Sequence, residues 1–257
     1  MLVSFSSPLI EGTLLRRYKR FLADIELNTG EIVTAHCCNP GAMLGLNAEG
    51  AKVWLSKSNN PARKLRYSWE LVEVDLGDGP ALVGINTAHP NRAAEAAIAA
   101  GLIPALAGYD EMKREVSYGT GSRIDILLRS EDKPPCYVEV KNVHLMRKSG
   151  LAEFPDSVTS RGAKHLRELA NVVDAGGRGV MLFLIQRDDA QSFDIARDID
   201  PTYAAAFETA RAQGVEVFAI ACPMSLKGIG RPRAVPVSEP PARSNRLSAV
   251  AQGEITP

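Results

Sequence analysis

The chain has 257 residues, of which 45% are hydrophobic and 23% are charged, and its 30 basic and 30 acidic side chains leave no net charge. This length fits one large domain or two small ones with a sizeable core. The balanced charge argues against a strongly basic protein that binds nucleic acid through its overall field, but it is compatible with a local basic groove.

The first 80 residues show short strand patterns separated by turns and no convincing helix. Alternating apolar residues predict a hairpin from segments 21–27 and 32–36, with a turn at 28–31 between them. Two further strands are predicted over residues 52–56 and 66–74. Several short strands with turns between them predict a small β-barrel, which we assign to residues 1–82.

The pattern changes near Asn86. An Ala-rich segment, residues 91–103, predicts a helix with Asn91 as its N-cap and Gly101 near its end. The later elements alternate between strands and helices; they are strands at 112–118, 123–128 and 136–145, a helix at 160–175, a strand at 180–185, a helix at 201–213 and a strand at 215–221. This order predicts an α/β domain over residues 83–229, with a long loop at 146–157.

Neither the end of the chain nor the cysteines indicate a further folded domain. Residues 230–257 are rich in Pro, Ser and Arg, which predicts a mobile tail. The spacing of the four cysteines, Cys37, Cys38, Cys136 and Cys222, fits neither a zinc site nor a disulfide framework, so reduced thiols are expected. The first residues lack the features of a signal peptide, and no apolar run is long enough to span a bilayer. We therefore expect a cytoplasmic protein without membrane association.

Two opposite charges interrupt the apolar segment "YVEVKNV", residues 137–143. Glu139 and Lys141 are two residues apart and share one face of the predicted strand, and Asp125 is a polar residue inside the preceding apolar run. If the strands pair, the two carboxylates repel each other, and one should have a raised pKa. A divalent cation removes this repulsion, and Mg²⁺ (or Mn²⁺) prefers carboxylate and water ligands. Lys141 could then orient or deprotonate a water, or stabilise charge on a phosphate.

A purely structural explanation of these charges remains open. Glu139 and Lys141 could form an ion pair at the edge of a sheet, with Asp125 unrelated to them. The apolar neighbours Val138 and Val140 make a solvated edge strand the weaker interpretation, because burying three ionisable groups costs several kcal/mol per ion unless they are paired or bind a metal.

The same residues carry a family resemblance. Asp125, followed after thirteen residues by Glu139-Val140-Lys141, resembles the D-x(n)-E-x-K motif of PD-(D/E)XK restriction-endonuclease-like nucleases, although Ile124 stands where their motif has proline. Four longer stretches resemble the sugar fermentation stimulation protein A (SfsA) family over nearly the whole chain, to about residue 224. They are "AHCCNPGAM" (35–43), "SRIDILL" (122–128), "YVEVKNVHL" (137–145) and "FPDSVTSRGAKHLREL" (154–169).

This resemblance implies both a fold and a function. The expected fold is an N-terminal OB-like β-barrel followed by a restriction-endonuclease-like α/β domain with a mixed central sheet. The implied function is DNA binding without sequence preference, with a regulatory role in sugar (maltose) metabolism. Nuclease relatives often supply a further Glu from the helix before the three strands, so Glu95 is added to Asp125 and Glu139 as a candidate metal ligand and to the catalytic set with Lys141. A solvent-facing Glu95 is the alternative.

Nucleic-acid contacts are predicted from basic residues in three places, namely the barrel, the 146–157 loop and the start of the 160–175 helix. They are Arg16, Arg17, Lys19, Arg20, Arg147, Lys148, Arg161, Lys164 and His165. The loop is expected to close over the substrate, and the helix N-terminus favours phosphate. Solvated surface charges are the alternative for each group.

Three functions follow from these residues. The first is a DNA-binding protein with a Mg²⁺-dependent, nuclease-like site that cleaves phosphodiesters. The second is a DNA-binding transcriptional regulator that keeps the fold without catalysis. The third is a small-molecule or metal-binding protein that uses the same cleft. The sequence leaves the oligomeric state open.

Overall fold

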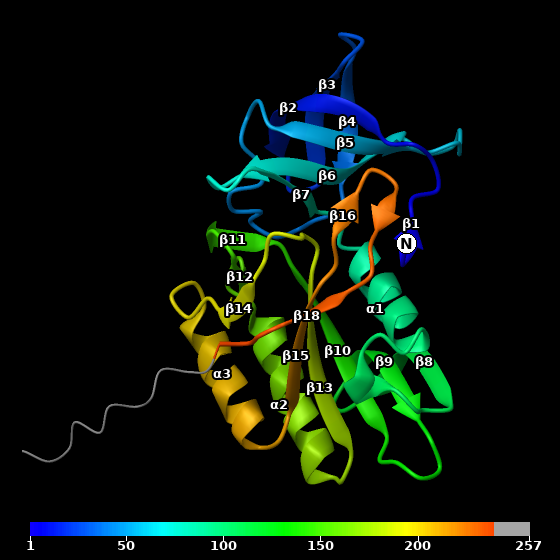
Figure 1. Cartoon of the computed structure of the whole chain (residues 1–257), viewed down its shortest axis with the longest axis vertical. Coiled ribbons are helices and arrows are strands. Elements are labelled where there is room, and N and C mark those ends of the chain that lie inside the picture. Colours follow the sequence, from blue (N-terminus) through cyan, green and yellow to red (C-terminus); the bar gives the residue numbers. More distant parts are fainter. Residues whose placement is uncertain (239–257) are drawn as a thin grey trace, which may run out of the picture.

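The N-terminal part folds as a closed five-stranded barrel in a computed structural model that describes residues 1–238. Its strands are β2 (Ile10–Tyr18), β3 (Leu22–Leu27), β4 (Ile32–Cys37), β5 (Lys52–Lys57) and β6 (Tyr67–Asp75), with β7 (Pro80–Gly84) added beside β6. They follow the order β4-β3-β2-β5-β6-β7, and the pairing of β4 with β6 closes the ring (Figure 1). This confirms the predicted OB-like barrel, although the sequence patterns did not identify β2 and β7.

Alternation of side chains builds the barrel core. In β3, for example, Ala23, Ile25 and Leu27 point inward, and the residues between them are more exposed. Trp69 from β6 is fully buried among them. Closure into a barrel leaves no open edge among the five strands, which explains how such short strands form a stable unit.

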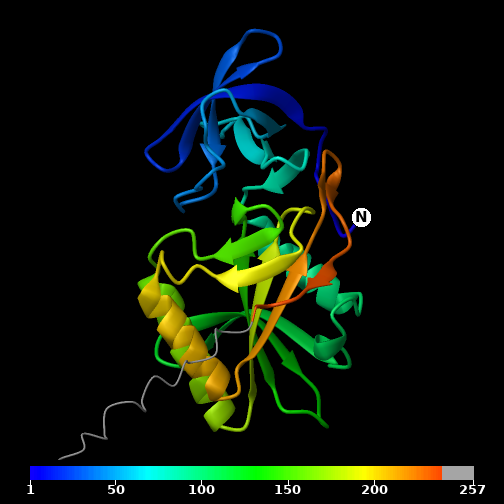
Figure 2. The same cartoon turned by 60° about the vertical axis from the view of Figure 1, so that its left-hand side comes forward.

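The C-terminal part is a mixed six-stranded sheet with helices on both faces (Figures 1 and 2). Its strands have the order β18-β15-β13-β10-β9-β8, in which β10, β13 and β15 are parallel and the others antiparallel. They are β8 (Glu111–Tyr118), β9 (Ser122–Arg129), β10 (Cys136–Val143), β13 (Arg178–Ile185), β15 (Glu216–Ala221) and β18 (Arg233–Val235). The predicted α/β domain with a mixed sheet is confirmed.

The helices divide the core of this domain into two layers. Helix α1 (His89–Ala99) packs on one face, and α2 (Ser160–Asp174) and α3 (Pro201–Ala212) pack on the other. The central strand β13 serves both layers: Val180, Leu182 and Leu184 pack toward α1, whereas the residues between them pack toward α2 and α3. Burial on both faces is why this strand is a continuous apolar run. A 3₁₀ turn, η1 (Pro104–Leu106), follows α1.

The predicted loop at residues 146–157 was wrong. This segment contains a hairpin of β11 (Leu145–Lys148) and β12 (Leu151–Phe154), which joins β14 (Ser192–Ile195) in a separate three-stranded sheet. Strands of four residues show too few alternating positions to be recognised. A second three-stranded sheet brings the N-terminal segment beside residues 224–229 and consists of β1 (Val3–Ser4), β16 (Met224–Ser225) and β17 (Gly228–Ile229).

The predicted mobile tail was also wrong for its first part. Strand β18 lies within residues 230–238 and pairs antiparallel with β15 at the edge of the large sheet. Residues 239–257, the rest of the predicted tail, lie outside the described residues.

The turn "NPGAM" (residues 39–43), between β4 and β5 of the barrel, contacts the α/β domain at Asp156. The backbone amide of Met43 donates to Asp156 Oδ2 at 3.0 Å, and His144 Nε2 lies 3.3 Å from the same oxygen. A Cβ atom at Gly41 would lie only 2.6 Å from this carboxylate, so the close approach requires glycine. Burial alone would raise the pKa of Asp156, but the hydrogen bond and charge of His144 and the bond from Met43 lower it to about 2.

Replacing Asp156 with alanine should therefore loosen the junction. We expect the free energy of unfolding at pH 7 to fall by about 2–4 kcal/mol, because the Met43 amide and the imidazole of His144 lose a charged acceptor. Urea denaturation measures this loss, and Asp174→Ala, at an exposed aspartate that ends α2, is the control. An unchanged midpoint in Asp156→Ala would show that this carboxylate does not hold the two parts together.

Candidate active site

Asp125 on β9 and Glu139 on β10 lie where these two strands separate. The β9–β10 ladder ends at the pair Val138–Ile126, so the next position along it would place Asp125 opposite Glu139. Instead of continuing the ladder, Asp125 Oδ2 accepts a hydrogen bond from the backbone amide of Val140 at 2.8 Å. The side chain thus replaces a backbone acceptor at the point where the strands diverge.

A break in the strand alternation brings Asp125 to this position. In β9, Ile126 packs into the core beneath α1, whereas Ile124 packs into the core beneath α2, although residues two apart normally share a face. On the neighbouring strand β8, Arg114 pairs with Ile126 and Val116 pairs with Ile124, so Glu115 lies between them. Glu115 has a φ of 51°, a left-handed conformation that costs roughly 1–2 kcal/mol for a non-glycine residue. Backbone strain beside the candidate carboxylate accompanies this reversal.

Glu139 is almost completely buried, and its carboxylate contacts the side chains of Lys141 and His165. Lys141 Nζ lies 2.7 Å from Glu139 Oε1, and His165 Nδ1 of α2 forms a close contact with the same oxygen. Burial would raise the pKa of Glu139, but the hydrogen bond from His165 and the charge of Lys141 outweigh it and lower the pKa. Glu139 is therefore held as a carboxylate.

Asp125 titrates in the opposite direction. Burial and the negative charge of Glu139 raise its pKa to about 6, against the lowering effect of its bonds from Val140 and Asn91. Two neighbouring carboxylates whose pKa values move apart are the pattern expected of an acid–base or metal site.

The donor set fits a hard divalent cation. Oε2 of Glu139 is buried without a hydrogen-bond partner and remains a free acceptor beside a second carboxylate. Carboxylate oxygens with added waters are what Mg²⁺ or Mn²⁺ requires. Within residues 1–238, however, no three His, Cys, Asp or Glu side chains are grouped to hold a metal by themselves.

Glu95, the predicted third ligand, has another partner in the structure. Its Oε2 lies 3.2 Å from a guanidinium nitrogen of Arg114 on β8, and its side chain is 35% exposed. The α1 residue that bonds to Asp125 is Asn91, whose Nδ2 donates to Oδ1 at 2.8 Å. Asn91 was predicted to be the N-cap, but α1 begins earlier at His89, with Ala88 at the cap position. A role of Glu95 in metal binding stays a prediction.

The basic start of α2 divides into surface and buried groups. Arg161 is exposed and donates to His165 Nε2 at 3.3 Å, and Lys164 Nζ donates to the carbonyl of Thr120 at 3.0 Å. His165 was predicted to contact the phosphates of a nucleic acid. In the structure it is only 4% exposed and contacts Glu139, so it belongs to the carboxylate site and does not lie on the surface. Helical periodicity accounts for this difference, since His165 lies beside the buried Leu166 and Leu169 positions.

Two side chains of the basic cluster on the barrel, Arg16 and Arg17, already bind other groups of the barrel. Arg17 donates to the carbonyls of Asn39 and Gly41 and so supports the "NPGAM" turn. Arg16 is paired with Asp24 at 2.9 Å but keeps a side-chain exposure of 70%. Lys19 and Arg20 form the turn between β2 and β3, both with positive φ.

Arg147 of the predicted substrate-closing loop is fixed in the β11–β12 hairpin. It forms ion pairs with Glu153 and Asp198, whereas Lys148 at the end of β11 is exposed. The segment is thus a hairpin held by ion pairs and not a loop. Closure over a substrate stays a prediction.

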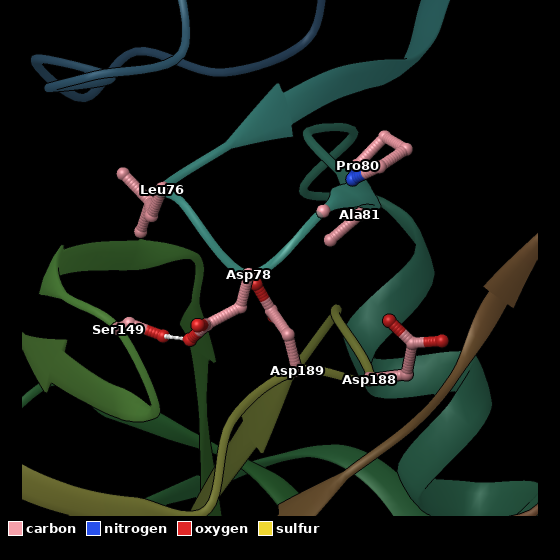
Figure 3. A pocket seen from close by; sticks show the side chains of 8 residues that line it. Leu76, Asp78, Pro80, Ala81, Ser149, Asp188 and Asp189 are labelled. Carbon is pink, nitrogen blue, oxygen red and sulfur yellow. Dashed lines mark hydrogen bonds between the residues drawn. The ribbon is translucent and has the colours of Figure 1, made fainter.

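A pocket of about 260 Å³ lies away from these carboxylates (Figure 3). It is formed by the turn between β6 and β7, the turn between β11 and β12 and the segment after β13. Asp78, Asp188 and Asp189 line it, and Asp189 is paired with Arg187. This acidic lining disfavours the binding of phosphate groups.

Comparison with known proteins places both parts of the chain. Residues 88–228 match the family model described as "Sugar fermentation stimulation protein RE domain", and residues 15–85 match "SfsA N-terminal OB domain". A sugar fermentation stimulation protein homolog from Azorhizobium caulinodans is 58% identical over 225 residues, covering 88% of this chain and 95% of the relative. One from Methylorubrum populi is 55% identical over 238 residues, covering 93% and 96%.

A solved structure shows the same architecture. Pyrococcus furiosus SfsA in complex with Ca²⁺ superposes with a TM-score of 0.82 at 28% identity, covering 93% of this chain and 99% of that one. Across residues 1–238, no helix has the length and apolar character needed to cross a membrane.

Proposed function

The chain belongs to the sugar fermentation stimulation protein (SfsA) family, and from this premise we propose that it binds DNA without sequence preference and cleaves phosphodiesters with a divalent cation. The observation that supports cleavage most directly is the arrangement of Asp125, Glu139 and Lys141 where β9 and β10 separate. The Ca²⁺ in the Pyrococcus furiosus relative supports a divalent cation for this chain as well.

Each residue has a distinct role in this proposal. Asp125 and Glu139 supply carboxylate oxygens for Mg²⁺ or Mn²⁺, which would neutralise charge on the scissile phosphate and activate a water. The ammonium of Lys141 is fixed by Glu139 at 2.7 Å, so it can orient the attacking water and stabilise the charge that develops on the phosphate oxygens. His165 and Asn91 position the two carboxylates.

Binding would rest on contacts to the phosphate backbone. Exposed cationic side chains at the start of α2 and on the barrel, among them Arg161 and Arg16, can contact phosphates without reading bases. Affinity should then fall with rising salt, as counterions are released less favourably.

Purified protein with plasmid and single-stranded DNA tests this function. We expect cleavage with Mg²⁺ or Mn²⁺ that stops in EDTA, together with DNA retention that weakens between about 50 and 200 mM salt. Retention without cleavage in either metal would favour the regulator that lacks catalysis. Absence of retention at low salt would contradict both DNA-dependent functions.

A further inference from the structure

Buried polar atoms without hydrogen-bond partners gather around Glu139. Of the eight such side-chain atoms within residues 1–238, five belong to Glu139, Glu168, Tyr118 and Tyr203. Both carboxylate oxygens of Glu168 are among them, and Glu168 is only 7% exposed. Folded proteins rarely leave such groups unsatisfied, so a cluster of them indicates a missing partner.

Glu168 lies on the α2 face that contacts Glu139. It follows His165 by three residues, which places the two side chains on one face of the helix, and His165 contacts Glu139. The electrostatics agree: besides burial, the charges of Glu139, Glu168 and Asp125 all raise the pKa of Tyr118. Lys164 forms an ion pair with Glu168, in which Nζ lies 3.6 Å from Oε1, but the Lys164 side chain is 44% exposed.

The missing partner must be a donor or a cation, because the cluster consists of acceptors and hydroxyls. On Asp125, both oxygens already accept hydrogen bonds, from Asn91 and Val140. On Glu139, both contacts fall on Oε1 and leave Oε2 free. The free carboxylate acceptors of this cluster are therefore Oε2 of Glu139 and the two oxygens of Glu168.

We propose that Glu168 is a cation ligand of this site: a hydrated divalent cation binds the carboxylates of Glu139 and Glu168, and a carboxylate oxygen of Asp125 holds one of its waters. Mg²⁺ and Mn²⁺ bind through one or two carboxylates and keep several waters, and those waters can donate to Glu168 and Tyr118. The proposal deepens the proposed function, since it assigns the ion of that site a position between α2 and the sheet.

Direct Mn²⁺ binding without DNA tests this position. We expect Glu168→Gln to weaken Mn²⁺ binding by tenfold or more in calorimetry, whereas Glu208→Gln on α3 leaves it unchanged. Because the metal-free protein holds an unsatisfied carboxylate, Glu168→Gln should melt no lower than wild type in EDTA and should lose most of the Mn²⁺-induced rise in melting temperature. Equal Mn²⁺ affinity in wild type and Glu168→Gln, or no Mn²⁺ binding by wild type, would overturn the proposal.

A crystal of the wild-type protein soaked in Mn²⁺ provides a second measurement that needs no variant. An anomalous peak within about 2.0–2.4 Å of oxygens of both Glu139 and Glu168 is expected. A peak coordinated by Asp125 and Glu139 with Glu168 unliganded would refute the position. Both measurements are independent of cleavage: a protein that binds Mn²⁺ at Glu168 but leaves DNA intact refutes the proposed nuclease function and supports this site.

Discussion

Replacing Lys141 with alanine is expected to lower the rate of DNA cleavage by about 10²–10³-fold, while the affinity for DNA changes little. The ammonium stands 2.7 Å from Glu139, beside the two carboxylates that would hold the cation. A preorganised charge at such a site acts on the transition state, where the phosphate gains negative charge, more than on the bound substrate. Single-turnover cleavage at saturating DNA measures this effect apart from binding.

The chain contains a close control for this substitution. Lys113 on β8 also follows a Glu by two residues and pairs with it, at 2.6 Å from Glu111, but both side chains are about half exposed. Lys113→Ala should leave cleavage unchanged. Equal losses in the two variants would mean that Lys141 contributes only general charge, and full activity in Lys141→Ala would refute its role in the reaction.

Those parts of the fold that depend on long periodic patterns were predictable from the sequence. The amphipathic helix α2 repeats its pattern over 15 residues, and the buried strand β13 contains an uninterrupted apolar run; both were identified close to their observed bounds. The short strands β11, β12 and β18 have three or four residues each and depend on tertiary pairing, which no local pattern reveals.

The site was predictable only where chemistry conflicts with local pattern. Asp125, Glu139 and Lys141 were identified because charges interrupt apolar strands. Asn91 was missed because an Asn near a helix start also fits a cap. Glu168 was missed because a single Glu in a charged helix resembles a solvated residue. Its place one turn after His165, beside the buried Leu169, is the signal that could have identified it.

Asp125→Asn is expected to stabilise the metal-free protein at neutral pH. Burial and the charge of Glu139 raise the pKa of Asp125 from 3.8 to about 6. A raised carboxyl pKa means that the folded state holds the proton more tightly than the unfolded state. Its contribution to stability is therefore fully present below about pH 4 and is lost as the pH rises through 6. By pH 7 this loss amounts to roughly 3 kcal/mol, at 1.36 kcal/mol per pKa unit.

Asparagine carries no charge at any of these pH values, so it avoids this loss. Asparagine has one acceptor oxygen where the carboxylate has two, so one of the hydrogen bonds from Val140 and Asn91 is lost, which costs about 1 kcal/mol. The net gain of Asp125→Asn should be about 1–2 kcal/mol at pH 7–8 and should disappear or reverse near pH 4, where wild-type Asp125 is protonated. The neighbouring charges of Glu139 and Lys141 and the imidazole of His165 are the same in both proteins.

Urea denaturation in EDTA from pH 4 to pH 8 measures this difference, with Asp174→Asn at the exposed end of α2 as the control. A constant difference between wild type and Asp125→Asn across this range would show that Asp125 does not titrate near pH 6. Adding Mn²⁺ at pH 7.5 should stabilise wild type more than Asp125→Asn. A bound cation stabilises the ionised carboxylate of Asp125, which burial and the charge of Glu139 otherwise make unfavourable. The repulsion between Asp125 and Glu139 that destabilises the fold is thus the same property that prepares the site to bind a cation.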